Sequence, residues 1–373
     1  MKAIYKIAMT IVFSGLCLVA CDKELKEDTH MDISVETNDH VSFDGKTVTV
    51  KKGSPVTFSF NGDPDFISFF SGEIGNEYKY RNRTEMQIED VTKCEIDFRV
   101  WYSYGNATTI KNSTFAMISD QFEGLKKVSV EEDKQAIENC EWVDLIDQNK
   151  LPTKANSGGE ALAGSATFNH DLTSYLGKKI TVALHFNPKA NSATMPQPNF
   201  MDMQINLSFN NGKTTTILAK DFEFSPLNLV YNLDDLNKNS GHIQKLKTTL
   251  GNKDLTLEEL KNETYTKQIS YLTIDGHIPY FWKVTVPKQI LIAGGPANYT
   301  MADSWLISAP LLLNGSCEPD KGTSIKNISQ SLDVYAYTYE EPGTYTATFV
   351  ANNANYVHQG GQVVRELTIK VVE

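Results

Sequence analysis

Aromatic residues gather in several short segments of this 373-residue chain, and the neighbours of two of these segments indicate which chemistry they could serve. One segment runs from Trp101 to Tyr104, and the other runs from Tyr280 to Trp282. An aromatic ring can stack on the C–H face of a sugar, while nearby amides and carboxylates bond the sugar hydroxyls. We expect Trp282 to be an exposed platform for a glycan, and Trp305, in an apolar strand, to lie in the core. The glycan-binding candidates are Trp101, Tyr104, Tyr280, Trp282 and Asn298.

Oxygen ligands near a predicted loop offer a second chemistry, the binding of structural calcium. Asp63 and Asp65 lie close together in the sequence and Glu73 follows. Ca²⁺ takes oxygen ligands, but this spacing lacks the dense alternation of acidic residues typical of calcium loops. Turn chemistry and surface charge explain these residues more simply. No other cofactor is expected.

The motifs of common enzymes are missing from the sequence. It has no phosphate-binding Gly-Lys loop, no H-E-x-x-H and no nucleophile elbow. The seven histidines are scattered. Enzyme activity is therefore not expected, although a β-sandwich hydrolase can hide its residues in sequence. The formal net charge of −11, without a basic cluster, argues against nucleic acid as a partner.

The first residues have the features of a bacterial lipoprotein signal. Lys2 and Lys6 precede a short apolar stretch that ends in Leu-Val-Ala and Cys21. We expect residues 1–20 to be removed and Cys21 to carry lipid, with a simple secretory signal as the alternative. Residues 21–31 form an acidic tether that resembles the export signal of Bacteroidota surface lipoproteins. It is too short to distinguish the cell surface from the periplasmic leaflet of the outer membrane.

The other cysteines match no zinc pattern. Cys17 lies in the signal segment, so Cys94, Cys140 and Cys317 remain at long spacings. Three thiols allow at most one disulfide. Buried free thiols are favoured, and the disulfide stays open.

Alternating apolar and polar residues predict an all-β chain. Tyr345, Ala347 and Phe349 share one face of a strand, opposite threonines at 344, 346 and 348. Similar alternation runs through 180–186 and 201–209, and Asn211-Gly212 predicts a hairpin. Two segments, 131–139 and 254–262, are expected to be helical, the second with a capping box of Thr256 and Glu259.

Two distant runs carry a resemblance to a known family. The run from Phe58 to Tyr78 and the run from Glu341 to Ala351, with its Pro-Gly-Thr-Tyr hairpin, resemble a Bacteroidota surface lipoprotein family of unknown function. The resemblance implies an immunoglobulin-like module of the polycystic-kidney-disease (PKD) type, split by a discoidin-like jelly-roll sandwich. The expected domains are 32–112 plus 324–373 for the PKD-like sandwich and 113–323 for the insertion. Residues 222–278 depart from the family pattern and are expected to form an extra excursion.

Such families are usually associated with glycan utilisation. The resemblance therefore implies a lipid-anchored protein of the outer membrane that binds polysaccharide or oligosaccharide beside importer proteins, without catalysis. The alternative is an adhesin-like or importer-associated interaction protein with no sugar site.

Overall fold

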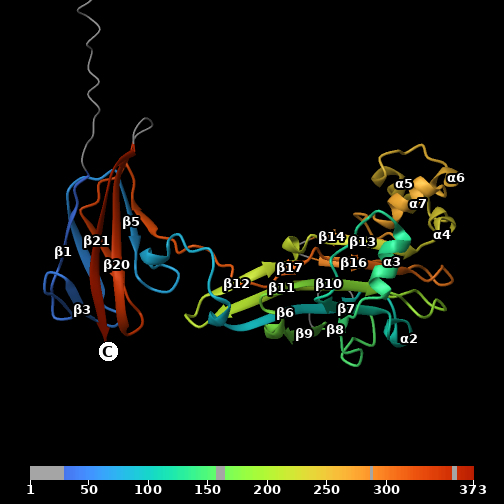
Figure 1. Cartoon of the computed structure of the whole chain (residues 1–373), viewed down its shortest axis with the longest axis horizontal. Helices are drawn as coiled ribbons and strands as arrows, with labels where there is room; N and C mark the ends of the chain where they lie inside the picture. Colours follow the sequence, from blue (N-terminus) through green and yellow to red (C-terminus); the bar gives the residue numbers. More distant parts are fainter. Residues whose placement is uncertain (1–28, 157–163, 286–288, 355–358) are drawn as a thin grey trace, which may run out of the picture. The chain divides into compact units, whose positions relative to one another are not determined.

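A computed structural model describes residues 29–156, 164–285, 289–354 and 359–373 (Figure 1). The chain divides into two compact units. The first, here called the terminal unit, combines the described residues up to Asn82 with Pro319–Glu373. The second, the central unit, is Arg83–Glu318. Both units consist mainly of antiparallel sheets in sandwich-like layers, which confirms the predicted all-β class.

The terminal unit contains two sheets. The larger has the order β18-β5-β20-β21-β3-β2 and the smaller the order β1-β4-β19. The 3₁₀ turn η1 (Tyr78–Tyr80) follows β5. The strands are β1 (Asp32–Val35), β2 (Val41–Phe43), β3 (Thr47–Lys51), β4 (Pro55–Asn61), β5 (Phe66–Phe70), β18 (Thr323–Lys326), β19 (Val334–Thr338), β20 (Gly343–Ala354) and β21 (Gln359–Val372).

Strands from opposite ends of the chain pair within the terminal unit. β3 pairs with β21 in parallel, and β5 and β4 pair with β20 and β19 in antiparallel fashion. Phe58, Phe69 and Phe349 meet in the core between the sheets, with ring centroids 4.8 to 6.0 Å apart. The predicted alternation of β20 is confirmed, because Ala347 and Phe349 are fully buried in this core.

The predicted tether is shorter than expected. Met31 is fully buried in the core of the terminal unit. The Thr29 hydroxyl donates to the carbonyl oxygen of Gly361. These contacts place residues 29–31 in the folded unit, because a buried methionine side chain removes apolar surface from water. The signal segment, Cys21 and the rest of the tether lie outside the described residues.

The central unit packs two six-stranded sheets against each other. We call β14-β15-β11-β6-β9 with β12 the open sheet, and β13-β16-β10-β7-β8 with β17 the covered sheet. The open sheet comprises β6 (Val91–Tyr102), β9 (Ala166–Asp171), β11 (Pro198–Phe209), β12 (Thr214–Leu218), β14 (Trp282–Thr285) and β15 (Gln289–Ile292). The covered sheet comprises β7 (Thr114–Ser119), β8 (Val143–Asp144), β10 (Lys179–Phe186), β13 (Ser225–Val230), β16 (Asp303–Ile307) and β17 (Leu311–Leu312).

Strand β6 corrects the first predicted domain boundary. Residues up to 112 were expected in the terminal sandwich, but β6 pairs with β9 and β11 of the central unit. Its residues Ile96, Phe98 and Val100 are buried in the core between the open and covered sheets. The sequence could not show this, because alternation says which face of a strand is buried and not against which sheet it packs.

The central unit also contains several short helices. The Thr256–Glu259 capping box is confirmed at α6, and the other predicted helix is α3. The excursion expected between 222 and 278 contains β13 and four helices, α4 to α7, whose buried leucines and isoleucines join the sandwich core. Among the described residues of this unit, the helices and 3₁₀ turns are α2 (Ala107–Ile110), α3 (Val130–Glu138), α4 (Leu233–Asn237), α5 (Ser240–Thr249), α6 (Leu257–Leu260), α7 (Glu263–Ser270), η2 (Ile88–Asp90), η4 (Thr173–Tyr175) and η5 (Ala219–Phe222).

In the described part of the chain, no helix combines the length and the hydrophobicity needed to span a bilayer.

Candidate functional site

Trp282 and Tyr280 do not form an exposed platform, so this prediction is wrong. Both side chains are buried, Trp282 completely. Trp282 lies opposite Ile292 on β15, which is also fully buried, and its ring packs 6.4 Å from Phe200. Cross-strand partners share a face of the sheet, so the position of Ile292 fixes Trp282 inside. The Tyr280 hydroxyl donates to the Asp235 carboxylate.

Trp101 lies on the outer face of the open sheet. The core residues of β6 have even numbers, from Ile96 to Tyr102, and the odd-numbered residues from Glu95 to Trp101 are half-buried. Successive side chains of a strand point to opposite faces. The odd-numbered residues therefore face away from the covered sheet, toward solvent.

A bulge in β11 fixes the surroundings of Trp101. Met201 pairs with Arg99, and the next pair is Gln204 with Asp97, so β11 has one residue more than β6 here. The extra residue turns Met201 to the outer face, whereas the alternation grouped it with the core residue Met203. That grouping is wrong. The Trp101 Nε1 donates to the Met201 sulfur at 3.1 Å, which holds the ring.

Asp202 occupies the bulge with a backbone φ of +52°. Asp and Asn adopt this left-handed region more readily than other non-glycine residues. The Arg99 Nε donates to the Asp202 carboxylate at 2.6 Å. The bulge therefore places a fixed cation–carboxylate pair beside Met201 and next to Trp101 along the strand.

A row of hydrogen bonds crosses the open sheet from β9 to β12. The Asp97 carboxylate accepts from Asn169 Nδ2 at 2.6 Å and from Asn206 Nδ2 at 2.8 Å. Asn206 Oδ1 accepts from the Thr216 hydroxyl at 2.7 Å. These bonds fix the orientation of amides and carboxylates that can also bond a ligand hydroxyl. We call this row with Trp101, Arg99 and Asp202 the polar face.

A buried amide supports the strand beside Trp101. Asn199, opposite Trp101, is completely buried and donates to Ser103 Oγ and to the Gln197 carbonyl, both at 2.9 Å. Its Oδ1 accepts from Gln289 Nε2 at 2.6 Å. A buried amide with its donors and acceptor paired holds the backbone in one conformation. The sequence gives no sign of this contact, since Gln289 is distant along the chain.

The other two candidates are both at the surface. Tyr104 is 55% exposed and follows the end of β6. Asn298 is exposed in the loop between β15 and β16, at a φ of +67°, and its backbone N–H donates to Asn191. Tyr104 is thus exposed just beyond the end of β6, whereas Asn298 serves a turn.

A second aromatic cluster covers part of the covered sheet. Trp305 stacks on His185 with ring centroids 3.9 Å apart, and His185 Nε2 lies 2.8 Å from Asp303 Oδ1. The Trp142 ring centroid lies 6.0 Å from that of Trp305. Trp305 is therefore half-buried on the outer face of the covered sheet rather than in the central core. Its ring already packs with His185 and Trp142. Trp305 and Leu306 are neighbours in the strand 303–307, so their side chains point to opposite faces. The sequence pattern could therefore have predicted the position of Trp305.

The calcium candidates do not converge. Asp63 is exposed and lies 3.4 Å from the buried ammonium of Lys326. The Glu73 carboxylate accepts from the hydroxyls of Ser71 and Tyr337. The Asp65 backbone N–H donates to Asn353. Among the described residues, no three His, Cys, Asp or Glu side chains are placed to hold a metal ion.

The three cysteines of the folded part are free thiols. Cys94 and Cys317 are buried and Cys140 is half-buried. Burial, followed by the charges of Asp171 and Glu95, raises the pKa of the Cys94 thiol to about 12. A neutral buried thiol is chemically inert, so Cys94 serves the core.

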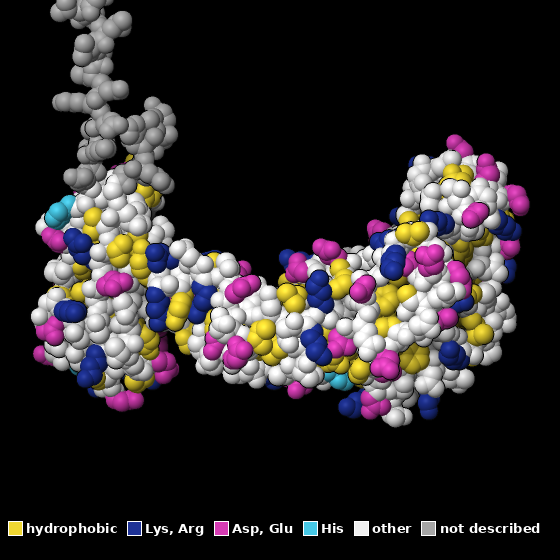
Figure 2. All heavy atoms as spheres, viewed as in Figure 1, with side chains coloured by type: hydrophobic (Ala, Val, Ile, Leu, Met, Phe, Trp, Pro, Cys, Tyr) yellow, Lys and Arg dark blue, Asp and Glu magenta, His cyan; other side chains and the backbone are white. Residues whose placement is uncertain are grey.

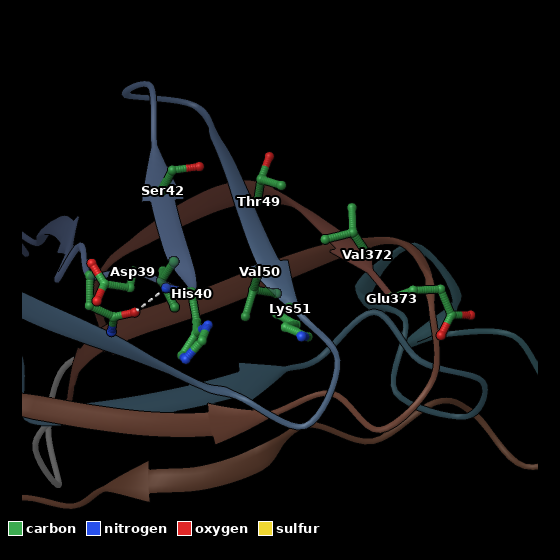
Figure 3. A pocket seen from close by; sticks show the side chains of 10 residues that line it. Asp39, His40, Ser42, Thr49, Val50, Lys51, Val372 and Glu373 are labelled. Carbon is green, nitrogen blue, oxygen red and sulfur yellow. Dashed lines mark hydrogen bonds between the residues drawn. The ribbon is translucent and has the colours of Figure 1, made fainter.

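A groove of about 300 Å³ lies in the terminal unit along β2 and β3 (Figure 3). His40, Ser42, Thr49 and Lys51 line it, and in Figure 3 these side chains point in different directions rather than toward one point. Ligand sites need polar groups that converge. We therefore place the candidate site on the polar face.

Comparison with known proteins gives a family and no activity. Residues 20–222, more than half of the chain, match the family model described as "Domain of unknown function (DUF5017)". No curated protein matches the chain. The C-terminal domain of the Streptococcus pyogenes antigen I/II-family protein AspA aligns over 92% of this chain and 99% of that chain. Its identity of 10% and TM-score of 0.09 carry no argument about fold or function. By the family match, the chain belongs to the family of the domain of unknown function DUF5017.

Proposed function

We propose that this protein is a non-catalytic glycan-binding lipoprotein of the outer membrane, and that the polar face is its binding surface. The observation that carries the proposal is the position of Trp101. Its ring is half-buried on the outer face of the open sheet and is held by Met201. Rigid aromatic rings supply much of the affinity of binding surfaces, because they bury a large area at a low cost in conformational entropy.

The chemistry of the polar face suits a sugar chain laid across the strands. A pyranose ring would stack on Trp101, and its hydroxyls would bond the Arg99–Asp202 pair. Further along the chain, hydroxyls would meet Asp97, Asn169 and Asn206, which their mutual hydrogen bonds already orient. Preoriented groups lose little entropy on binding.

The charge of the surface supports a neutral ligand. Figure 2 shows acidic and basic side chains mixed over the visible face of each unit, without a large region of one sign. Arg99 pairs with Asp202 within the polar face, and Lys93 pairs with Glu95 further along β6. A neutral polysaccharide pays no electrostatic penalty on such a surface.

Affinity electrophoresis in gels that contain starch, xylan, pectin, galactomannan or dextran tests the proposal. The mature protein should be retarded by at least one of these polysaccharides. Trp101→Ala should strongly reduce the retardation, and Trp101→Phe, which keeps a ring, should retain most of it. Circular dichroism of both variants checks that the fold is intact. Equal migration of wild type and Trp101→Ala in every gel would overturn the proposal.

Two further measurements separate the rival functions. Release of reducing ends from a retarding polysaccharide would show a hydrolase. A stoichiometric protein partner in a pull-down from outer membranes, without any glycan retention, would favour the importer-associated or adhesin-like interaction protein.

The proposed anchor is a lipid on Cys21, as the preceding Leu-Val-Ala sequence indicates. Mass spectrometry of the mature N-terminal peptide should find an acylated cysteine. Cys21→Ser should move the protein from the membrane fraction to the soluble fraction. An unmodified cysteine in the mature peptide would contradict the anchor.

A further inference from the structure

The terminal unit contains a polar groove that is separate from the polar face of the central unit. Its volume is about 320 Å³. This is at the lower end of the range of about 300–1,000 Å³ for small-molecule sites, and it fits a ligand of one ring. We call it the threonine groove; it is lined by Gly72, Glu77, Tyr78, Lys79, Thr344, Thr346, Thr348 and Glu366.

The floor of the threonine groove is one face of β20. Ala347 and Phe349 point into the core of the terminal unit, so Thr344, Thr346 and Thr348 point to the other face. Hydroxyls in such a row can each donate one hydrogen bond and accept others. The floor therefore offers both donors and acceptors to a ligand.

Thr348 is the least expected member of this row. Its side chain is 1% exposed, and its hydroxyl has no hydrogen-bond partner among the described residues. Burial of an unpaired hydroxyl costs about 1–3 kcal/mol. An unpaired threonine hydroxyl at the floor of a groove is expected where a bound ligand supplies its hydrogen-bond partner.

The walls of the threonine groove are rigid. Tyr78 packs edge-on against Phe70 with centroids 5.2 Å apart, and the Arg81 guanidinium lies 4.0 Å from the ring centre of Tyr78. Gly72 closes the groove from the side with a φ of +83°, and a Cβ there would lie 2.5 Å from the backbone nitrogen of Thr346. Only glycine permits this close approach to β20.

The charges of the groove decide the class of ligand. Glu77 is paired with Lys79 at 2.8 Å, which leaves Glu366, opposite Thr348 on β21, as the second carboxylate. An anion would be repelled by Glu366, and an apolar ligand would leave the Thr348 hydroxyl unpaired. A neutral polyhydroxylated ring satisfies the hydroxyls and the carboxylate together.

We propose that the threonine groove is a second sugar-binding site, which holds one neutral pyranose unit through the Thr348 hydroxyl. The class of ligand rests on the proposed glycan-binding function, but the site itself does not depend on the polar face. A second site raises avidity only for a glycan chain that engages both sites simultaneously.

The test compares Thr348→Val with Thr368→Val and Trp101→Ala, each in the full mature chain. Binding is measured by titration calorimetry, with oligosaccharides of a polysaccharide that retards the wild type. Thr368→Val on β21, opposite Thr346 but not among the residues that line the groove, is the matched control. Thr348→Val should bind about three- to tenfold more weakly and should unfold at the same or a higher temperature, because it removes an unpaired buried hydroxyl. Thr368→Val should bind as wild type.

The outcomes separate the two sites. Unchanged binding by Thr348→Val, with weaker binding by Trp101→Ala, would overturn the threonine groove alone. The reverse result would support the groove and overturn the polar face. Absence of retardation of the wild type by every polysaccharide would overturn both. A lower unfolding temperature of Thr348→Val with unchanged binding would show that the hydroxyl is structural.

Discussion

The Asp235 carboxylate accepts a hydrogen bond from the Tyr280 hydroxyl at 2.8 Å, and this bond joins helix α4 to the segment before β14. The Thr300 backbone N–H donates to the same carboxylate at 2.8 Å and Lys238 donates at 2.7 Å. Burial raises the pKa of Asp235, but the bonds from Lys238, Thr300 and Tyr280 outweigh burial and lower the pKa to about 2.

Asp235→Asn should therefore lower the free energy of unfolding at pH 7 by about 1–3 kcal/mol, because its three donors, among them the buried Tyr280 hydroxyl, lose a charged acceptor. The folded-state pKa is below the ordinary value of 3.8, so the ionised carboxylate contributes stability above about pH 4. This contribution, about 2 kcal/mol, is lost as the pH falls from about 4 toward 2.

Urea unfolding at pH 7, 4 and 2.5 checks this prediction. The loss of stability at low pH should be smaller in Asp235→Asn than in the wild type. Asp234→Asn, at the exposed neighbouring carboxylate that pairs with Lys261, is the control and should change little. Equal effects of the two substitutions would contradict the role of Asp235.

Trp282→Ala should destabilise the central unit by about 3–5 kcal/mol, because it removes the largest of the completely buried side chains. Trp101→Ala should cost less, since Trp101 is half-buried on an open face. Thermal unfolding of both variants beside the wild type checks the order. A larger loss for Trp101→Ala would show that Trp101 belongs to the core.

Asp202→Val should destabilise the protein by about 1–3 kcal/mol, because a β-branched residue fits poorly at a φ of +52°. Asp202→Gly removes the same bond to Arg99 but allows the backbone conformation, so it should cost less. Urea unfolding of the two variants separates the backbone contribution from the ion pair. Equal stability of the two would mean that β11 has no bulge in solution.

Cys140 should react first among the three thiols of the folded part. Cys94 is buried and its pKa is raised to about 12, so it is almost wholly protonated at pH 8. Labelling of the native protein with iodoacetamide at pH 8, followed by peptide mass spectrometry, should modify Cys140 before Cys94. Cys140→Ser is the control. Labelling of Cys94 at the rate of Cys140 would show that β6 opens readily.

Local pattern predicted the strands well where one face is buried. The alternation around Phe349 identified β20 and its core face, and Asn211-Gly212 gave the β11–β12 hairpin, with Gly212 at a φ of +81°. The Thr256–Glu259 spacing gave the start of α6. Each of these features depends on residues a few positions apart, so the sequence contains the information directly.

The candidate site was predictable only in part. Trp101 was among the candidates, but Arg99, Asp97 and Asn169 were not. Arg99 and Asp97 lie on the same strand as Trp101, but their partners Asp202 and Asn169 lie in distant segments. No local signal links these residues until the strands pair. Trp282 was assigned to the surface because its own segment is too short for the alternation to show which face is buried.

The sequence by itself therefore determined the class of fold, the period and faces of most strands, and the N-terminal signal that predicts a lipid anchor. Tertiary structure decided which sheet receives β6, to which side the bulge turns Met201, and that Thr348 lies unpaired at the floor of a groove. The physical reason is the range of the forces involved. Side-chain alternation follows from the geometry of a single strand, whereas register, bulges and cavities follow from packing between segments that are far apart in the chain.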